Sequence, residues 1–322
     1  MNTKVDSTQR VAVAADSTVP AIRVEGLTKD FGTNRAVDEL SFEIPAGGVT
    51  GFVGPNGSGK STTFRMLLGL IKPTSGNAWM LGHPISDPYR YIARVGALVE
   101  SPALYPKLSG YKNLLALARL GRLPTSRIDE ALETVDLTDR AGDRYDSYSL
   151  GMKQRLGIAA ALLQKPEVLM LDEPTNGLDP AGTVEIRALF RRLAEEGTSI
   201  IVSSHLLSEI QAACDRLVMI QDGRLIFSGP LDELLAARHG SVVAITDDPS
   251  DTAHLAQLVE QAGKQVRIRD ARVEVDAEPE WSAQLGRLAL GAGIVLRELR
   301  PVEADLESTF LELTATDRKG SS

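Results

Sequence analysis

Between residues 22 and 229, short runs of branched apolar residues alternate with longer amphipathic segments. This alternation is typical of βα units, in which buried strands form a largely parallel sheet and helices cover it. The runs that best fit buried strands are Val49–Val53, Val168–Leu171, Ile200–Ser203 and Leu217–Ile220. An amphipathic segment that starts with Asp179-Pro180 and stops at Gly197 fits a helix, and residues 221–224 fit a hairpin turn. The pattern therefore predicts an α/β domain over residues 21–235.

One segment inside this domain interrupts the rhythm of strands. Between Gly110 and Leu163 the pattern is mostly helical, and Ser126 and Asp129 have the spacing of a capping box at the start of one helix. We therefore expect a helical subdomain at residues 101–164.

The pattern changes again after Arg238. Two short helical patterns lie between three strand candidates, which are Val242–Thr246, Gln265–Asp270 and Ile294–Leu299. These elements predict a small C-terminal α+β accessory domain over residues 240–316. At the other end, residues 1–20 are polar and rich in alanine, which predicts a disordered N-terminal tail and does not fit a secretory signal.

Composition narrows the class of protein. Of the 322 residues, 43% are hydrophobic and 24% are charged, which is the balance of a folded globular protein. A formal net charge of -8 disfavours nucleic-acid binding, which normally needs a basic surface. Cys214 is the only cysteine, so an intramolecular disulfide and a cysteine-built metal site are excluded, and a buried thiol in a reducing compartment is expected. No run reaches the ~18 apolar residues that span a bilayer, so the chain is not itself a channel.

One glycine-rich segment matches the phosphate-binding loop of nucleotide-binding proteins at every specified position. It comprises Gly54, Pro55, Asn56, Gly57, Ser58, Gly59, Lys60 and Ser61. The apolar run ending at Val53 precedes it and a helical pattern over Thr62–Leu70 follows, which is the context that such a loop needs. Glycines let several backbone N–H groups converge on one anion; Lys60 would reach the β- and γ-phosphates, Ser61 would bind Mg²⁺, and Thr62 would lie beside the nucleotide. The alternative, a flexible glycine-rich turn, leaves the Lys-Ser pair unexplained.

Two adjacent acids follow another buried run. Asp172 and Glu173 come at the end of the apolar stretch that begins at Val168. Because ligands of open α/β sheets bind at the carboxyl ends of parallel strands, both carboxylates are expected beside the phosphate loop. Asp172 would hold Mg²⁺ through water, and Glu173 would orient and polarise the attacking water. A solvated acidic turn is the alternative for this pair taken alone.

Three further segments carry a family resemblance. Tyr148–Arg155 reads Tyr-Ser-Leu-Gly-Met-Lys-Gln-Arg and resembles the signature segment of ABC ATPases, and the resemblance continues through Glu173–Pro180 and Ile201–His205. It covers residues 22–229. It implies a phosphate-loop ATPase fold, ATP and Mg²⁺ as cofactors, and ATP hydrolysis that powers a separate transmembrane permease. The chain would then be cytoplasmic and peripheral, held on the cytosolic face of the cell membrane through that permease.

The resemblance also assigns roles to individual residues. Phe31 falls where an aromatic ring stacks on adenine, and a core position is its alternative. In this family the signature of one subunit faces the phosphate loop of another, so Ser149 and Gly151 would contact the γ-phosphate bound by a second copy. Asp179 would couple the two sites of such a homodimer, and His205 would sense the γ-phosphate. Ser149 and Asp179 are also suitable helix N-caps.

Two departures from the family pattern affect these assignments. Glu100 stands where the family commonly has glutamine; it remains a candidate for the nucleotide and metal site, although a carboxylate adds charge and cannot donate as an amide does. Leu150 and Met152 replace the usual glycine and glutamine of the signature, which would loosen the contacts with the second copy. With the C-terminal segment 306–313, these features resemble exporters of the bacitracin-resistance and multidrug type. Residues 100–111 are the candidate docking surface for the permease.

Two other functions remain open. A nucleic-acid- or ribosome-associated ABC ATPase would usually carry two ATPase halves or a long heptad insertion, and the sequence has neither. A regulatory switch that closes on ATP without transport is the second alternative, because the altered signature could slow hydrolysis. In the preferred hypothesis of a transport ATPase, Lys60, Glu173 and His205 are the catalytic residues.

Overall fold

The computed structural model describes residues 19–100, 102–236 and 240–302, together with residues 306, 307, 309, 310 and 313. The chain forms two compact units, one of Met1–Ser204 with Ile220–Leu225 and one of His205–Met219 with Ile226–Ser322. Residues 1–18 of the predicted disordered tail lie outside the described residues. Across the described ranges, no helix has both the length and the apolar character needed to cross a membrane. The domain boundaries inferred from the sequence stay predictions.

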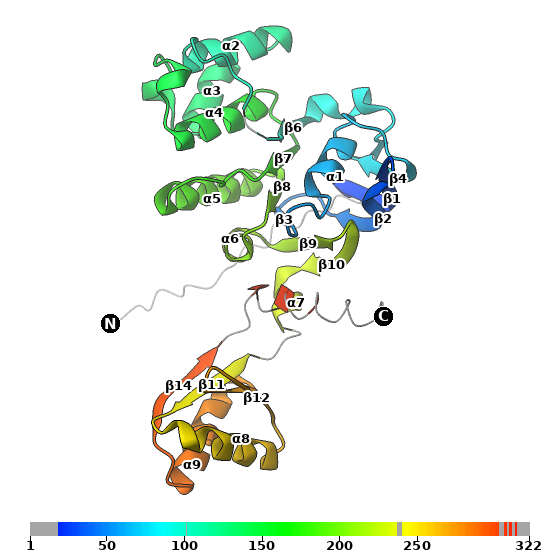
Figure 1. Cartoon of the computed structure of the whole chain (residues 1–322). Coiled ribbons are helices and arrows are strands. Elements are labelled where there is room, and N and C mark those ends of the chain that lie inside the picture. Colours follow the sequence, from blue (N-terminus) through cyan, green and yellow to red (C-terminus); the bar gives the residue numbers. More distant parts are fainter. Residues whose placement is uncertain are drawn as a thin grey trace, which may run out of the picture. The chain divides into compact units, whose positions relative to one another are not determined.

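Residues 22–230 form two sheets (Figure 1). The first is antiparallel with the order β2-β1-β4-β5, and its strands are β1 (Ile22–Phe31), β2 (Asn34–Ile44), β4 (Ser75–Met80) and β5 (His83–Pro84). The second has the order β10-β9-β3-β8-β7-β6, with β3 (Val49–Val53), β6 (Val95–Leu98), β7 (Val168–Asp172), β8 (Ser199–Ser204), β9 (Arg216–Gln221) and β10 (Arg224–Pro230). In it β3, β8, β7 and β6 run parallel, which confirms the expected parallel core. The antiparallel sheet was not predicted.

A buried aromatic cluster joins the two sheets to the first helix. It consists of Phe42 on β2, Phe52 on β3 and Phe64 on α1 (Lys60–Leu67). Neighbouring ring centroids lie 5.6 and 5.5 Å apart in tilted arrangements, the geometry that aromatic pairs prefer. Because α1 begins at the phosphate loop, this packing fixes the helix, and with it one end of the loop, against both sheets.

The helical part of the first unit gathers beyond the strand β6 (Figure 1). It contains α2 (Gly110–Leu120), α3 (Ser126–Thr134) and α4 (Leu150–Leu162), which pack on one another. The capping box expected at Ser126 is wrong, because Thr125 is the N-cap residue of α3 and no side chain caps that helix. By contrast, α5 (Pro180–Glu195) follows Asp179 as expected, and Gly197 turns the chain after it with a φ of 99°. Short 3-10 helices cover Pro88–Arg90, Ile92–Arg94, Thr138–Arg140 and Tyr145–Ser147.

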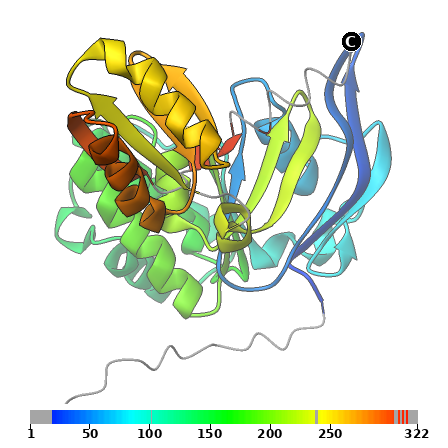
Figure 2. The same cartoon turned by 90° about the horizontal axis from the view of Figure 1, so that it is seen from below.

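The second unit contains α6 (Leu207–Ala213), α7 (Leu231–Ala236) and an α+β module. The module comprises β11 (Ser241–Thr246), α8 (Thr252–Gln261), β12 (Gln265–Arg269), β13 (Arg272–Asp276), α9 (Ser282–Gly291) and β14 (Leu296–Val302), with 3-10 helices at Pro249–Asp251 and Pro279–Trp281. Its sheet is antiparallel in the order β12-β13-β11-β14. Figure 2 shows α8 and α9 side by side on this sheet, where they enclose a core that includes Val242, Leu255, Val259, Val273 and Leu285. The expected α+β character is confirmed, whereas β13 was not predicted.

Candidate nucleotide-binding site

Close backbone contacts shape the loop between β3 and α1. A side chain at Gly54 would place its Cβ 2.2 Å from the carbonyl oxygen of Ile220, and one at Gly59 would place it 2.5 Å from that of Ala36. Gly59 also has a φ of 103°, in the left-handed region that other residues rarely adopt. No side chain caps α1, so the N–H groups of its first turn are not taken by a capping side chain. The helix start therefore offers backbone donors and a partial positive charge to an anion.

Lys60 lies against this loop and faces one of the predicted acids. Its side chain is 7% exposed, and Nζ donates to the carbonyl oxygens of Gly54 at 2.7 Å and Pro55 at 3.3 Å. Nζ also lies 3.7 Å from Oε1 of Glu173. A buried ammonium needs such partners, and its flexible stem allows Nζ to exchange loop carbonyl groups for phosphate oxygens. The structure thus brings together two predicted residues that are far apart in the sequence.

The two acids are held by a residue that the sequence did not single out. Asp172 ends β7 and is buried opposite Ser203 of the parallel strand β8. The Ser203 hydroxyl donates to Oδ1 of Asp172 and accepts from the backbone N–H of Glu173 at 2.9 Å. Glu173 itself has a φ of 51°, an uncommon value for a residue other than glycine. The only signal of Ser203 in the sequence is that it is a small polar residue directly after the apolar run of Ile200, Ile201 and Val202.

The groups around the loop fit a triphosphate with bound Mg²⁺. Ser58 Oγ is buried and has no hydrogen-bond partner in the described part of the chain, which leaves a donor inside the loop unused. Ser61 and Asp172 supply a hydroxyl and a carboxylate oxygen, which are ligands that Mg²⁺ prefers. Among the described residues no group of three or more His, Cys, Asp or Glu side chains could hold a metal ion alone. In proteins Mg²⁺ usually binds one or two side chains and takes its other ligands from phosphate oxygens and water.

Phe31 is a surface residue rather than a core residue. Its side chain lies at the end of β1 and is 50% exposed. The ammonium of Lys29 lies 5.0 Å from the centroid of the ring and donates to the carbonyl oxygen of Lys72 at 2.7 Å. The structure thus sets aside the core alternative and leaves the ring available for stacking, a role that stays a prediction.

Glu100 forms an ion pair with Arg65 of α1. Its side chain is largely exposed, and its backbone has a φ of 66°. The pairing gives the carboxylate a partner of opposite charge on the helix that starts at the phosphate loop. The metal role of Glu100 stays a prediction.

Two residues expected to act between copies, Ser149 of the signature segment and Asp179, each lie at the start of a helix. Ser149 is the N-cap residue of α4, and its Oγ accepts from the N–H of Met152 at 3.3 Å. Asp179 likewise caps α5, where its Oδ1 accepts from the N–H of Gly182 at 2.8 Å. Both capping roles inferred from the sequence are confirmed. Gly151 lies in the first turn of α4, and Leu150 beside it is exposed.

His205 directly follows β8 and is the first residue of the second unit. The Lys60 and Glu173 pair belongs to the first unit. The γ-phosphate role of His205 stays a prediction.

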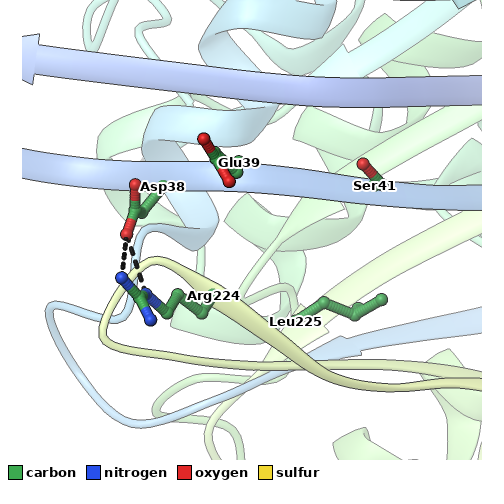
Figure 3. Close-up of a pocket in the computed structure, with 5 residues that line it drawn as sticks. All are labelled: Asp38, Glu39, Ser41, Arg224 and Leu225. Carbon is green, nitrogen blue, oxygen red and sulfur yellow. Dashed lines mark hydrogen bonds and ion pairs between the residues drawn. The ribbon is translucent and has the colours of Figure 1, made fainter.

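A small cavity of about 330 Å³ is lined by Asp38, Glu39, Ser41, Arg224 and Leu225. Figure 3 shows Arg224 pointing at Asp38, and its Nε donates to Oδ2 of Asp38 at 2.7 Å. A hydrogen bond from Arg35, followed by the one from Arg224, lowers the pKa of Asp38. None of the residues predicted for the nucleotide site lines this cavity.

Comparison with known proteins places the chain in a family. The family described as ABC transporter has a model that matches residues 37–176. The YhcH protein of Bacillus subtilis, described as an uncharacterized ABC transporter ATP-binding protein, is 41% identical over 92% of this chain and 97% of its own length. The bacitracin transport ATP-binding protein BcrA of Bacillus licheniformis is 38% identical over 91% of this chain and 96% of its own.

A solved structure agrees with this placement. CbiO1 from Clostridium perfringens, part of an ABC transporter complex, has a TM-score of 0.62 and 28% identity, and the match covers 76% of this chain and 98% of that one. The similarity in fold and the sequence matches over almost the whole chain thus indicate the same family. The chain belongs to the family of ABC transporter ATP-binding proteins.

Proposed function

We propose that this chain binds and hydrolyses ATP, and thereby powers export through a separate membrane permease. The observation that carries the proposal is the 3.7 Å approach of Lys60 Nζ to Glu173 Oε1 at the phosphate loop. It places a cation suited to phosphate and an acid suited to activate water at one point. Phosphoryl transfer to water depends on such positioning and charge stabilisation rather than on covalent chemistry by the protein.

Each step of hydrolysis has a candidate residue. Backbone donors of the loop and Nζ of Lys60 would bind the β- and γ-phosphates. Ser61 and Asp172 would hold Mg²⁺, which neutralises phosphate charge when bound. With Nζ turned to a phosphate oxygen, the Glu173 carboxylate would accept a hydrogen bond from the attacking water. Phe31 would stack on adenine, and Glu100 would accept from a water molecule bound to the metal.

We propose further that two copies form the working ATPase. Ser149 and Gly151 of one copy would complete the phosphate site of the other, with Asp179 and His205 coupling the sites. The geometry of α4 supports this role, because its first turn carries no acidic residue that would offset the partial positive charge of the helix start. A γ-phosphate bound by both copies would stabilise the dimer, and hydrolysis would release it.

The permease would bring the chain to the cytosolic face of the membrane. The relative BcrA is a bacitracin transport ATP-binding protein, which supports export of an antibiotic as the function of this chain. Residues 100–111 are the proposed docking surface, and within them Tyr105 presents an exposed aromatic side chain. Ser101 lies outside the described residues.

The proposal is tested with Glu173→Gln, which keeps the size of the side chain and removes its charge. We expect turnover to fall by about 10²- to 10⁴-fold, because the water loses its polarising carboxylate. The variant should still bind ATP and accumulate as a dimer in Mg-ATP, which size-exclusion chromatography with light scattering detects.

Glu195→Gln is the matched control, since it makes the same change at an exposed residue at the end of α5. It should hydrolyse ATP like the unmodified protein and show no excess of dimer. A Glu173→Gln protein that binds ATP and yet stays monomeric at saturating Mg-ATP would contradict the two-copy site.

A further inference from the structure

The Ser203 hydroxyl is a buried junction between the two acids of the proposed site. Its side chain is 0% exposed on a strand whose preceding residues are Ile200, Ile201 and Val202. A hydroxyl in such an environment is costly unless it is hydrogen-bonded. Here it both donates to Asp172 Oδ1 and accepts from the N–H of Glu173 at 2.9 Å.

The register of the sheet explains why this residue reaches both acids. The strands β7 and β8 are parallel neighbours, and Asp172 lies directly opposite Ser203. A serine Oγ is one bond from Cβ, so it has little freedom once its backbone is fixed in a central strand. The position of the hydroxyl is therefore set by the sheet and not by a mobile loop.

The two hydrogen bonds restrain a side chain and a backbone segment. The first occupies one carboxylate oxygen of Asp172 and so fixes the rotation of that carboxylate. The second fixes the peptide plane that leads into Glu173. It thereby opposes relaxation of this residue away from its uncommon φ of 51°. One hydroxyl thus holds the side chain of the first acid and the backbone of the second.

We propose that Ser203 is a positioning residue for the ATPase reaction. It fixes the positions of the proposed metal ligand Asp172 and of the proposed water-polarising residue Glu173 relative to each other and to the phosphate loop. Ser203 acts through these two residues and does not itself contact the nucleotide. The inference rests on the proposed function for the roles of Asp172 and Glu173.

The test compares Ser203→Ala, which removes the hydroxyl, with Ser203→Thr, which keeps it. In the protein without nucleotide, amide exchange followed by NMR should be about tenfold faster at Glu173 in Ser203→Ala, because that N–H loses its acceptor. With a non-hydrolysable ATP analogue present, Mn²⁺ affinity measured by electron paramagnetic resonance should fall by about 10- to 100-fold, as do metal sites that lose an orienting partner. Nucleotide affinity without divalent metal should stay within about twofold, because the phosphate loop is unchanged. Ser203→Thr should recover most of both losses.

Ser199→Ala is the matched control on the same strand. Ser199 is 3% exposed, and its Oγ also accepts one backbone N–H, that of Gly47 at 2.8 Å. It should alter neither the Glu173 amide nor Mn²⁺ affinity, although it costs a comparable hydrogen bond. Equal behaviour of Ser203→Ala and Ser199→Ala in the exchange and Mn²⁺ measurements would overturn the inference. Failure of the proposed function is distinct, because it would show as absent ATP turnover in the unmodified protein, while the exchange measurement does not depend on turnover.

Discussion

Replacing Asn113 should release the loop that precedes α2. Asn113 is 1% exposed, and its side chain accepts from the N–H of Tyr105 at 2.7 Å. It donates to the carbonyl oxygens of Tyr105 and Ser109, each at 3.1 Å, and to that of Leu108 at 3.5 Å. One buried amide thus satisfies several backbone groups of the proposed permease-docking loop.

The expected cost follows from these contacts. Three of the hydrogen bonds have good length, and each contributes about 0.5 to 1.5 kcal/mol net, so Asn113→Ala should lower the free energy of unfolding by about 2 to 4 kcal/mol. Asn113→Asp is more discriminating, because it keeps the acceptor for Tyr105 but turns a carboxylate toward carbonyl oxygens. It should be less stable than Asn113→Ala at pH 8 and gain stability at low pH, where the carboxyl group is protonated and can donate.

Urea unfolding followed by circular dichroism at pH 8 and at pH 5 measures both effects. Asn77→Ala serves as the control, because Asn77 is exposed on β4 and its replacement should change stability by no more than about 0.5 kcal/mol. The reasoning is refuted if Asn113→Ala costs less than about 0.5 kcal/mol, or if Asn113→Asp at pH 8 matches the unmodified protein.

Two further predictions concern other buried contacts. The hydroxyl of the buried Tyr91 donates to the carbonyl oxygen of Leu67 at 2.9 Å, and burial raises its pKa to about 12. Its stabilisation is complete below pH 10 and is lost as the pH rises toward 12, so Tyr91→Phe should cost about 1 to 2 kcal/mol at pH 8 and progressively less between pH 10 and 12, as read by urea unfolding. Gly76 has a φ of 83°, and an added Cβ would lie 2.1 Å from the carbonyl oxygen of Gly26. Gly76→Ala should therefore lower stability by about 2 to 4 kcal/mol in thermal unfolding, whereas Gly142→Ala, where a Cβ meets nothing within 4 Å, should change it by no more than about 0.5 kcal/mol.

The parallel core was predictable because its strands are buried on both faces. A strand such as β7 is apolar along nearly its whole length, so its sequence alone identifies it. The antiparallel sheet has no such signal. The burial pattern of β1 begins as a regular alternation, but its pairing with β2 shifts register after Val24, Leu27 and Lys29. Each shift breaks the period of two on which recognition of a strand depends.

The missed strand β13 has a different cause. It alternates apolar and charged residues, but the hairpin turn before it is made by Asp270 and Ala271, which have φ values of 46° and 60°. Turns with two positive φ values usually carry Asn-Gly or Asp-Gly, so the absence of glycine hides the turn. The turn at 221–224 was predicted correctly because Asp222 and Gly223 supply that usual pair, with φ values of 49° and 80°.

Some residues of the candidate site could be identified from the sequence, whereas others depend on the fold. Residues of the loop and the acids could be proposed from local sequence, since each motif reports its own chemistry. Ser203 could not, because its relation to Asp172 depends on which residues face each other across two strands that are far apart in the sequence. The pairing of Glu100 with Arg65 has the same origin, since only the fold brings the two side chains together.

The hairpin turn between β9 and β10 has a consequence for nucleotide binding. Gly223 donates its N–H to the carbonyl oxygen of Ser58 at 3.1 Å, and its own carbonyl oxygen accepts from Asp38 at 2.9 Å. Arg224 reinforces the link through its ion pair with Asp38 (Figure 3). The backbone of the phosphate loop is therefore tied at Ser58 to this turn, which is itself tied to β2, so ordering the loop for a nucleotide costs little conformational entropy. In the proposed mechanism the side chain of Lys60 changes partners on binding, because its bonds to loop carbonyl groups would be exchanged for bonds to phosphate oxygens. A loop fixed in this way favours affinity through preorganisation. In the proposed cycle, movement would then fall to side chains and to the association of two copies.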